Sequence, residues 1–242
     1  MFLENRKVFL TGGSGGIGRE IALTLAKEGA EIILFGGNNK AKLEATKNAI
    51  LSIGGKCEYF SFNLTDDTAL FENFEKAVAK TGGIDVLINN AGLAFNESVE
   101  TTAIETLDKI MAINFRVPYI LCQKSLPYLK KSNRASIINI CSVVSHAGYE
   151  NQSAYTASKH ALLGFTKALA SEVYKENIRT HAISPGGVFT DMIKISRPDL
   201  TGEGMIAPQE IADIVAFLLK NRGNAVIDEI IVHRVNKTPF LV

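Results

Sequence analysis

Tyr155 and Lys159 are the residues whose types and spacing point most directly to chemistry. In a helix, side chains four positions apart project from one face, about one turn from each other. A free tyrosine has a pKa of about 10 and is a poor base at neutral pH, but an adjacent ammonium group lowers that pKa. The pair can therefore exchange a proton with a substrate oxygen. An amphipathic helix with an edge tyrosine and a solvated lysine has the same pattern, so the context decides.

A glycine-rich segment is the second feature that suggests chemistry. Residues 11–18 read TGGSGGIG, directly after a short apolar run, and an amphipathic helix begins inside them. Glycines allow a tight turn and a close approach to a pyrophosphate, whose charge meets the free N–H groups at the helix start. A loop that merely needs positive φ angles explains the same glycines, so the turn alone is weak support.

The elements that would position these groups alternate along the chain. Apolar and β-branched runs predict seven strands, at residues 8–11, 32–35, 57–62, 86–89, 136–140, 180–183 and 227–232. Helical patterns lie between them, most plainly at 17–28 and from about 154 to 174. Alternating strands and helices are typical of a parallel sheet covered on both faces. We find no linker or internal repeat, so we expect one α/β domain over residues 1–242.

Composition narrows the class of function. The 242 residues carry 26 Lys and Arg against 25 Asp and Glu, so no overall field attracts nucleic acid or an anionic membrane. The three cysteines and four histidines show no disulfide or metal-ligand spacing, and we expect no metal. We find no apolar stretch near the ~18 residues of a membrane span. We expect a cytoplasmic protein that acts on small molecules.

In their order and spacing, these motifs resemble the short-chain dehydrogenase/reductase family over essentially the whole chain, and in particular its 3-oxoacyl-(acyl-carrier-protein) reductase-like members. Residues 11–18 resemble the cofactor turn of that family, and residues 89–92 (NNAG) its motif after strand four. Residues 184–188 (SPGGV) with Thr190 resemble the segment that shapes the nicotinamide pocket. The resemblance implies a single-domain Rossmann-type, doubly wound sheet with helices on both faces.

The resemblance also implies a catalytic set of Asn114, Ser142, Tyr155 and Lys159. Tyr155 would donate a proton to the carbonyl oxygen in reduction and accept it in oxidation. Lys159 would lower the pKa of Tyr155 and bind the ribose hydroxyls, and Ser142 would hydrogen-bond the substrate oxygen. Asn114 would hold a water that relays protons to Lys159; a capped or solvated helix asparagine is the alternative.

The implied cofactor contacts combine the glycine turn with segments after later strands: Gly12, Ser14, Gly16, Ile17, Gly18, Asn63, Leu64, Asn90, Ala91, Gly92, Tyr155, Lys159, Pro185, Gly186, Val188 and Thr190. Asn63 stands where relatives carry an aspartate, and its amide oxygen could accept the same bond from adenine. Residues 35–40 (FGGNNK) offer neither an acid for a ribose 2′-hydroxyl nor an arginine for a 2′-phosphate. With Lys40 and Lys42 nearby, we expect a weak preference for NADP(H) over NAD(H).

The function implied is an NAD(P)-dependent oxidoreductase that transfers a hydride between nicotinamide and a ketone or secondary alcohol. A catalytically silent dinucleotide-binding regulator or scaffold is the alternative. The apolar helices at 103–129 and 154–174 suggest a homodimer or homotetramer. The short segment 190–208 suggests a small, mobile lid and a small-to-medium ketone or β-keto ester substrate, although residues 232–242 lack the Asp-Gly-Gly ending of family ketoreductases.

Two further residues lie beside the predicted site. His146 follows Ser142 by four positions, in a predicted loop over the site. We weigh a substrate contact against a solvated loop histidine and favour the second. Cys141 ends a predicted strand, and we interpret it as a small apolar residue of the core rather than a nucleophile.

Overall fold

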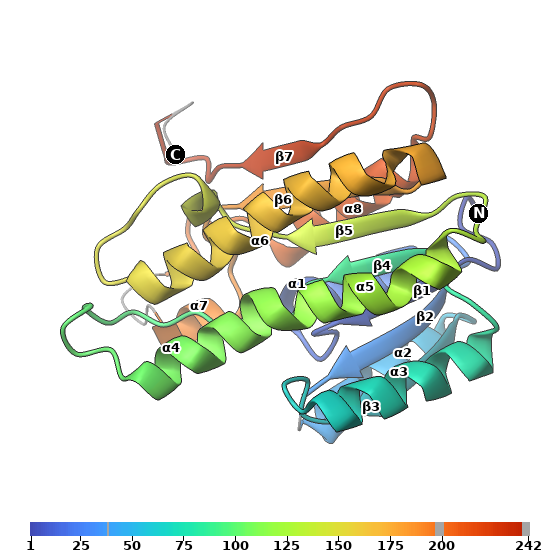
Figure 1. Ribbon diagram of the computed structural model, residues 1–242, viewed down its shortest axis with the longest axis horizontal. Helices are drawn as coiled ribbons and strands as arrows, with labels where there is room; N and C mark the ends of the chain where they lie inside the picture. Colours follow the sequence, from blue (N-terminus) through green and yellow to red (C-terminus); the bar gives the residue numbers. More distant parts are fainter. Residues whose placement is uncertain (38, 197–200, 239–242) are drawn as a thin grey trace.

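The computed structural model describes residues 1–37, 39–196 and 201–238. They form a seven-stranded parallel sheet in the order β3-β2-β1-β4-β5-β6-β7 (Figure 1). The strands are β1 (Lys7–Thr11), β2 (Glu31–Gly36), β3 (Lys56–Ser61), β4 (Val86–Asn89), β5 (Ser136–Ile140), β6 (Arg179–Pro185) and β7 (Glu229–Val232). The seven predicted strands and the doubly wound class are confirmed.

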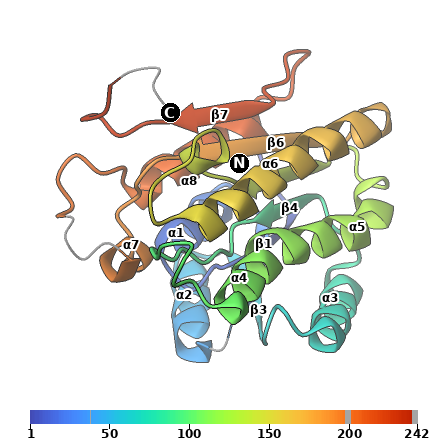
Figure 2. The same cartoon turned by 60° about the vertical axis from the view of Figure 1, so that its left-hand side comes forward.

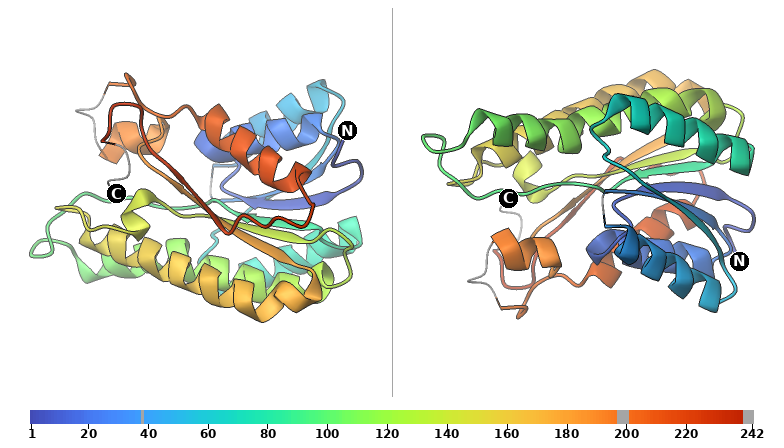
Figure 3. Two further views of the ribbon diagram at one scale, coloured as in Figure 1. Left: turned by 90° about the horizontal axis from the view of Figure 1, so that it is seen from above. Right: turned by 90° about the horizontal axis from the view of Figure 1, so that it is seen from below.

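Helices cover both faces of the sheet, as the two views in Figure 3 show. One face carries α1 (Gly16–Lys27), α2 (Lys40–Ser52) and α8 (Pro208–Lys220). The other carries α3 (Asp67–Thr81), α4 (Ile104–Met111), α5 (Val117–Leu129) and α6 (Ser153–Val173). The short α7 (Asp191–Ser196) lies at the carboxyl end of the strands (Figures 1 and 2), on the side of the sheet that carries α1, α2 and α8 (Figure 3).

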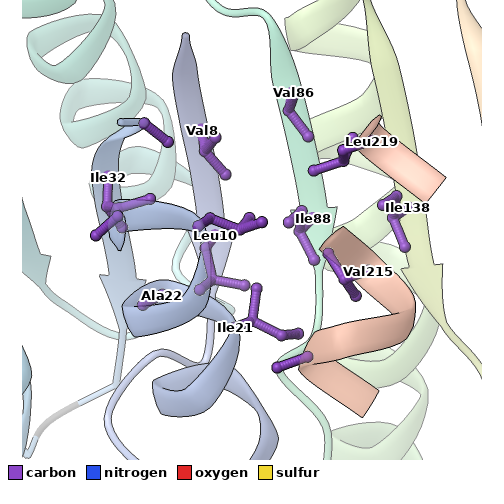
Figure 4. Packing of buried hydrophobic residues seen from close by; sticks show 14 of the residues in the cluster. Val8, Leu10, Ile21, Ala22, Ile32, Val86, Ile88, Ile138, Val215 and Leu219 are labelled. Carbon is purple, nitrogen blue, oxygen red and sulfur yellow. The ribbon is translucent and has the colours of Figure 1, made fainter. Parts of the chain in front are cut away.

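The central strands are largely apolar because both of their faces are buried. On β1, Val8 and Leu10 pack with Ile21 of α1 and Val215 of α8 (Figure 4). Phe9, between them in sequence, points to the opposite face and packs with residues of α3 and α5. Burial on both faces produces the continuous apolar runs that distinguish parallel strands from half-exposed ones.

The sheet order brings the sequence motifs to one edge. β1 pairs with β2 on one side and with β4 on the other, so the direction of strand succession reverses between β1 and β4. In open parallel sheets, ligands bind outside the carboxyl ends of the strands at such a reversal. The segments after β1, β4, β5 and β6 all begin at this edge.

One predicted helix differs from the observed structure. Residues 103–129 are not one α-helix but α4, a π-helical turn at Ala112–Arg116 and α5. A π-turn inserts one residue and changes the direction of the side chains beyond it. Here it turns Asn114 fully inward, with an exposed fraction of 0%.

Among the helices that the structure describes, none is long and apolar enough to cross a membrane.

Candidate active site

The turn after β1 packs directly against the helix that comes next. Gly12 has a φ of +74°, in the left-handed region that favours glycine. A Cβ on Gly18 would lie 2.2 Å from the Gly12 carbonyl oxygen, so this position of α1 has no room for a side chain. The glycines therefore do more than permit a turn, because they also bring the start of α1 against the end of β1.

The next strand reinforces this turn. The Asn90 side-chain amide donates to the carbonyls of Thr11 (3.0 Å) and Gly12 (3.2 Å). The main-chain N–H groups of Asn90 and Ala91 both donate to the Thr11 hydroxyl at 3.0 Å. The side chain of Asn90 is thus used within the protein, and its part in cofactor binding would be to hold the turn in shape.

The geometry of this turn fits a dinucleotide pyrophosphate. Gly15 is the N-cap of α1, and a Cβ added there would meet no atom within 4 Å, so the main chain is open to a close approach. Thr190, which ends the segment after β6, lies across the turn: its methyl carbon is 3.0 Å from the position of a Cβ on Gly16. The N-terminal N–H groups of α1 and the Thr190 segment therefore frame one space suited to an anion.

The other predicted cofactor residues differ in how far their side chains are buried. Leu64 is buried in the core on one face of the sheet, and Ile17 is partly buried against the core on the other face, so they can offer main-chain groups and little more. Ser14 is partly buried in the turn itself. Gly186 donates its N–H to Val232 at 2.8 Å, and Val188 forms a β-bridge with Ile206.

Ser142, Tyr155 and Lys159 meet at the carboxyl end of β5. Ser142 follows β5 and caps a short 3-10 turn, Val143–Ser145, and its hydroxyl donates to the Pro185 carbonyl at 3.4 Å and lies near Tyr155. Tyr155 lies in the first turn of α6 and is partly buried, whereas Lys159, one turn later, is buried with an exposed fraction of 4%. Lys159 Nζ donates to the Ile140 carbonyl at 2.7 Å and lies 5.9 Å from the centre of the Tyr155 ring.

The expectation that the pKa of Tyr155 is lowered is wrong, because the net shift is upward. Burial raises the pKa of Tyr155 to about 12, and the nearby Ser142 hydroxyl acts in the opposite direction. Burial also lowers the pKa of Lys159 to about 8. Spacing alone placed an ammonium beside a phenol, but both groups lie where charge is poorly solvated. Near neutral pH the Tyr155 phenol is therefore protonated, which suits a proton donor.

Asn114 is neither a helix cap nor a solvated residue. Its Oδ1 accepts from the Leu93 N–H at 2.8 Å, and its Nδ2 donates to the Leu93 carbonyl (2.9 Å) and to Ser158 Oγ (2.9 Å). A Cβ on Gly92 would lie 3.3 Å from Asn114 Oδ1 and 3.7 Å from Lys159 Nζ. Asn114 and Lys159 thus face the same point above Gly92.

Two side chains predicted to lie near the adenosine part of the cofactor already have partners within the protein. Asn63 Oδ1 accepts from the Thr65 N–H (3.1 Å) and hydroxyl (2.9 Å), which competes with the suggested bond to adenine. Lys42 Nζ lies 3.1 Å from Asp191 Oδ2, in an exposed ion pair between α2 and α7. Asn38 of the predicted specificity segment, residues 197–200 of the predicted lid and residues 239–242 lie outside the described residues.

Two polar clusters were not predicted from the sequence. His146 is a partly buried residue that contacts Glu229 of β7, so its interpretation as a solvated loop histidine is wrong. Asn139 of β5 accepts from Asn89 and donates to Thr166 of α6, both at 2.8 Å, which ties α6 to two strands. The partners in each cluster come from distant segments, and no spacing in the sequence signals them. Cys141 is buried beside Ser142, as expected.

Known proteins share both the sequence and this arrangement. A family model for short chain dehydrogenase matches residues 6–201 of the chain. The 3-oxoacyl-[acyl-carrier-protein] reductase FabG of Thermotoga maritima is 32% identical over 240 residues, which cover 96% of this chain and 97% of that protein.

Solved structures agree in fold across nearly the whole chain. A metagenomic short-chain oxidoreductase in complex with NADP has a TM-score of 0.85 and 29% identity, covering 98% of this chain and 100% of its own. A short chain dehydrogenase from Mycobacterium paratuberculosis bound to NAD has a TM-score of 0.86 and 26% identity, covering 96% and 97%. The chain therefore belongs to the short-chain dehydrogenase family and is an NAD(P)-dependent oxidoreductase.

Proposed function

We propose that the chain reduces a ketone, or oxidises the corresponding secondary alcohol, through Tyr155, Ser142, Lys159 and Asn114. The observation that carries this proposal is the meeting of the Tyr155 and Ser142 hydroxyls at the carboxyl end of β5, beside the glycine turn. The bound nicotinamide supplies or accepts the hydride. Tyr155 donates its proton to the carbonyl oxygen, and its raised pKa keeps that proton in place until the oxygen gains charge.

Ser142 and Lys159 act beside that proton transfer. The Ser142 hydroxyl donates a hydrogen bond to the substrate oxygen and fixes its position. Lys159 holds the nicotinamide ribose with its ammonium group. The shared point above Gly92, within 4 Å of both Asn114 Oδ1 and Lys159 Nζ, supports a proton path through one bridging water.

The cofactor would lie along the glycine turn with its pyrophosphate at the start of α1. A weak preference for NADP(H) is supported by Lys40 and Lys42, which begin α2 beside the predicted ribose position. The pairing of Lys42 with Asp191 keeps this preference small. Of the two solved structures described above, one holds NADP and the other NAD, which is compatible with either choice.

The substrate would be a small-to-medium ketone or β-keto ester. The segment after β6 is short, and its ends are joined by hydrogen bonds from Phe189 N–H to the Ile206 carbonyl (2.9 Å) and from Ile206 N–H to the Gly187 carbonyl (3.1 Å). The Phe189 ring lies against Gly202, with ring atoms 3.1–3.2 Å from the position of a Cβ there. These contacts favour a small lid over a deep enclosure.

The chain would work as one dinucleotide-binding and catalytic unit in the cytoplasm, assembled as a homodimer or homotetramer. Exposed aromatic residues support assembly: Tyr119 of α5 packs against Phe165 of α6 with ring centres 4.9 Å apart and is 46% exposed. A second copy could cover such a face.

The experiment that tests this function measures oxidation of NADPH and NADH by the purified protein against a panel of ketones and β-keto esters. We expect turnover with several acceptors and a drop of about 10²-fold or more in Ser142→Ala, since an oriented hydrogen-bond donor is worth that much. Ser52→Ala, on the exposed end of α2, is the matched control and should match the wild type. Dinucleotide binding without turnover on any acceptor would instead favour the regulator or scaffold.

A further inference from the structure

A single carboxylate on the edge strand β7 joins two segments that flank Ser142. Glu229 Oε1 accepts a hydrogen bond from Ser184 Oγ at 2.5 Å and lies 2.7 Å from His146 Nε2. Because a carboxylate offers only acceptors, the imidazole nitrogen that faces it carries the hydrogen. One oxygen atom therefore receives two donors, one from the segment after β5 and one from β6.

Each donor residue is joined through the main chain to a segment that contacts Ser142. His146 ends the 3-10 turn that Ser142 caps, and its N–H donates to the Val143 carbonyl at 3.0 Å. Ser184 immediately precedes Pro185, whose carbonyl accepts from Ser142 Oγ at 3.4 Å. Glu229 thereby links the turn on one side of the Ser142 hydroxyl to the carbonyl on its other side.

The cluster is fully buried at Ser184 and partly exposed at His146 and Glu229. Ser184 has an exposed fraction of 0%, and the His146 and Glu229 side chains are 22% and 19% exposed. Without the carboxylate, the Ser184 hydroxyl would lose its acceptor in a site closed to water, which destabilises that arrangement. This penalty for losing the acceptor keeps the segment after β5 and the strand β6 in one relative position.

We propose that Glu229 is a positioning residue for Ser142, acting through His146 and Ser184. The proposal rests on the function proposed above, in which Ser142 hydrogen-bonds the substrate oxygen. The Ser142 hydroxyl must leave the Pro185 carbonyl and donate to substrate at a fixed point between the turn and β6. Holding those two segments together keeps that point within the narrow range that hydride transfer to the carbonyl carbon requires.

The test is a double-mutant cycle between Glu229 and Ser142, with kcat, KM for the ketone and dinucleotide affinity measured for each protein. We expect Glu229→Ala to lower kcat by about 10-fold or more, the scale of small misplacements in an active site, while dinucleotide affinity stays within about 2-fold. In the Ser142→Ala background, the same change should lower kcat by less than about 2-fold. Glu229→Gln keeps an acceptor oxygen and should restore most of the lost kcat.

Two further variants keep the test decisive if Glu229→Ala fails to fold. Ser184→Ala and His146→Ala each remove one donor, and each should lower kcat in the wild-type background but not in the Ser142→Ala background. Asp228→Ala, which removes the neighbouring carboxylate, is the matched control and should keep wild-type kcat. An equal loss in both backgrounds, or a loss of thermal stability alone, refutes the role of Glu229. Wild-type turnover in Ser142→Ala refutes the role of Ser142 itself.

Discussion

The two halves of this active site are built from different parts of the chain. The turn after β1 offers main-chain groups, and its glycines are required because Gly18 leaves no room for a Cβ against the Gly12 carbonyl. The cluster at β5 and α6 offers side chains, with Ser142 near Tyr155 and beside the buried Lys159. The first half depends on the absence of side chains, and the second on their chemistry.

This difference separates binding from turnover. A main-chain cradle interacts with a pyrophosphate through N–H groups that nearly every residue has, so changes there act through backbone shape. A hydroxyl acts through its own proton, so its removal changes rate, whereas the Lys159 ammonium also holds the ribose, so its removal changes both rate and binding. Glycine variants of the turn and hydroxyl variants of the cluster should therefore fail in different measurements.

Tyr155→Phe should have the largest effect. It removes the hydroxyl and keeps the ring, so kcat should fall by the ~10²–10⁴-fold typical of general acid–base catalysis. Steady-state oxidation of NADPH with a saturating ketone measures this loss. A Tyr155→Phe protein with wild-type kcat would remove Tyr155 from the role of proton donor.

Lys159→Met should show how the charge buried in the side-chain cluster at β5 and α6 affects stability. The Lys159 pKa falls from 10.5 to about 8 on folding, so between these values the unfolded chain binds more protons. The contribution of Lys159 to the free energy of unfolding therefore rises with pH across this interval, by about 2 kcal/mol from pH 8 to about pH 10, at about 1.4 kcal/mol per pKa unit.

Urea titrations of the wild type and Lys159→Met at several pH values measure this contribution as the difference between the two proteins, which should shift in favour of the wild type from pH 8 to about pH 10. The raised pKa values of Tyr155 and of the buried thiols of Cys57, Cys122 and Cys141 lower the stability of both proteins as the pH rises, and so leave the difference unchanged. An identical pH dependence in both proteins would mean that Lys159 is not a buried charge. At neutral pH, Lys159→Met should also weaken both cofactor binding and turnover.

Gly18→Ala tests the first half. The added methyl group meets the Gly12 carbonyl oxygen, so we expect a loss of about 1–3 kcal/mol of stability, as for other overpacked sites, together with weaker dinucleotide binding. Thermal unfolding with and without NADP measures both effects. Gly223→Ala, where a Cβ would meet no atom within 4 Å, is the control, and an equal response of the two variants would contradict the packing argument.

Lys42→Ala should have the smallest effect. An exposed charge contributes less than about 1 kcal/mol, so KM for NADPH should rise only about 2- to 5-fold, while KM for NADH stays unchanged. An equal rise for both cofactors would show that Lys42 acts through α7 and not through a 2′-phosphate.

Features that depend on strand ends and continuous burial were predictable from the sequence. Most strands were located to within about one residue. Tyr155 and Lys159 were expected together from their helical spacing, and Ser142 was added to them by the family resemblance. The π-turn at Asn114 was missed, since its inserted residue leaves no periodic pattern. The raised pKa of Tyr155 depends on burial by distant segments, as does the contact of His146 with Glu229, and spacing along the chain reports neither.

The separation of binding from turnover is tested most directly by calorimetric titration of NADP into Tyr155→Phe and Gly18→Ala side by side. We predict that Tyr155→Phe binds NADP within about 2-fold of the wild type, and that Gly18→Ala binds it at least about 10-fold more weakly, since its cradle is distorted. If Tyr155→Phe lost as much affinity as Gly18→Ala, the two halves of the site would not divide binding from chemistry.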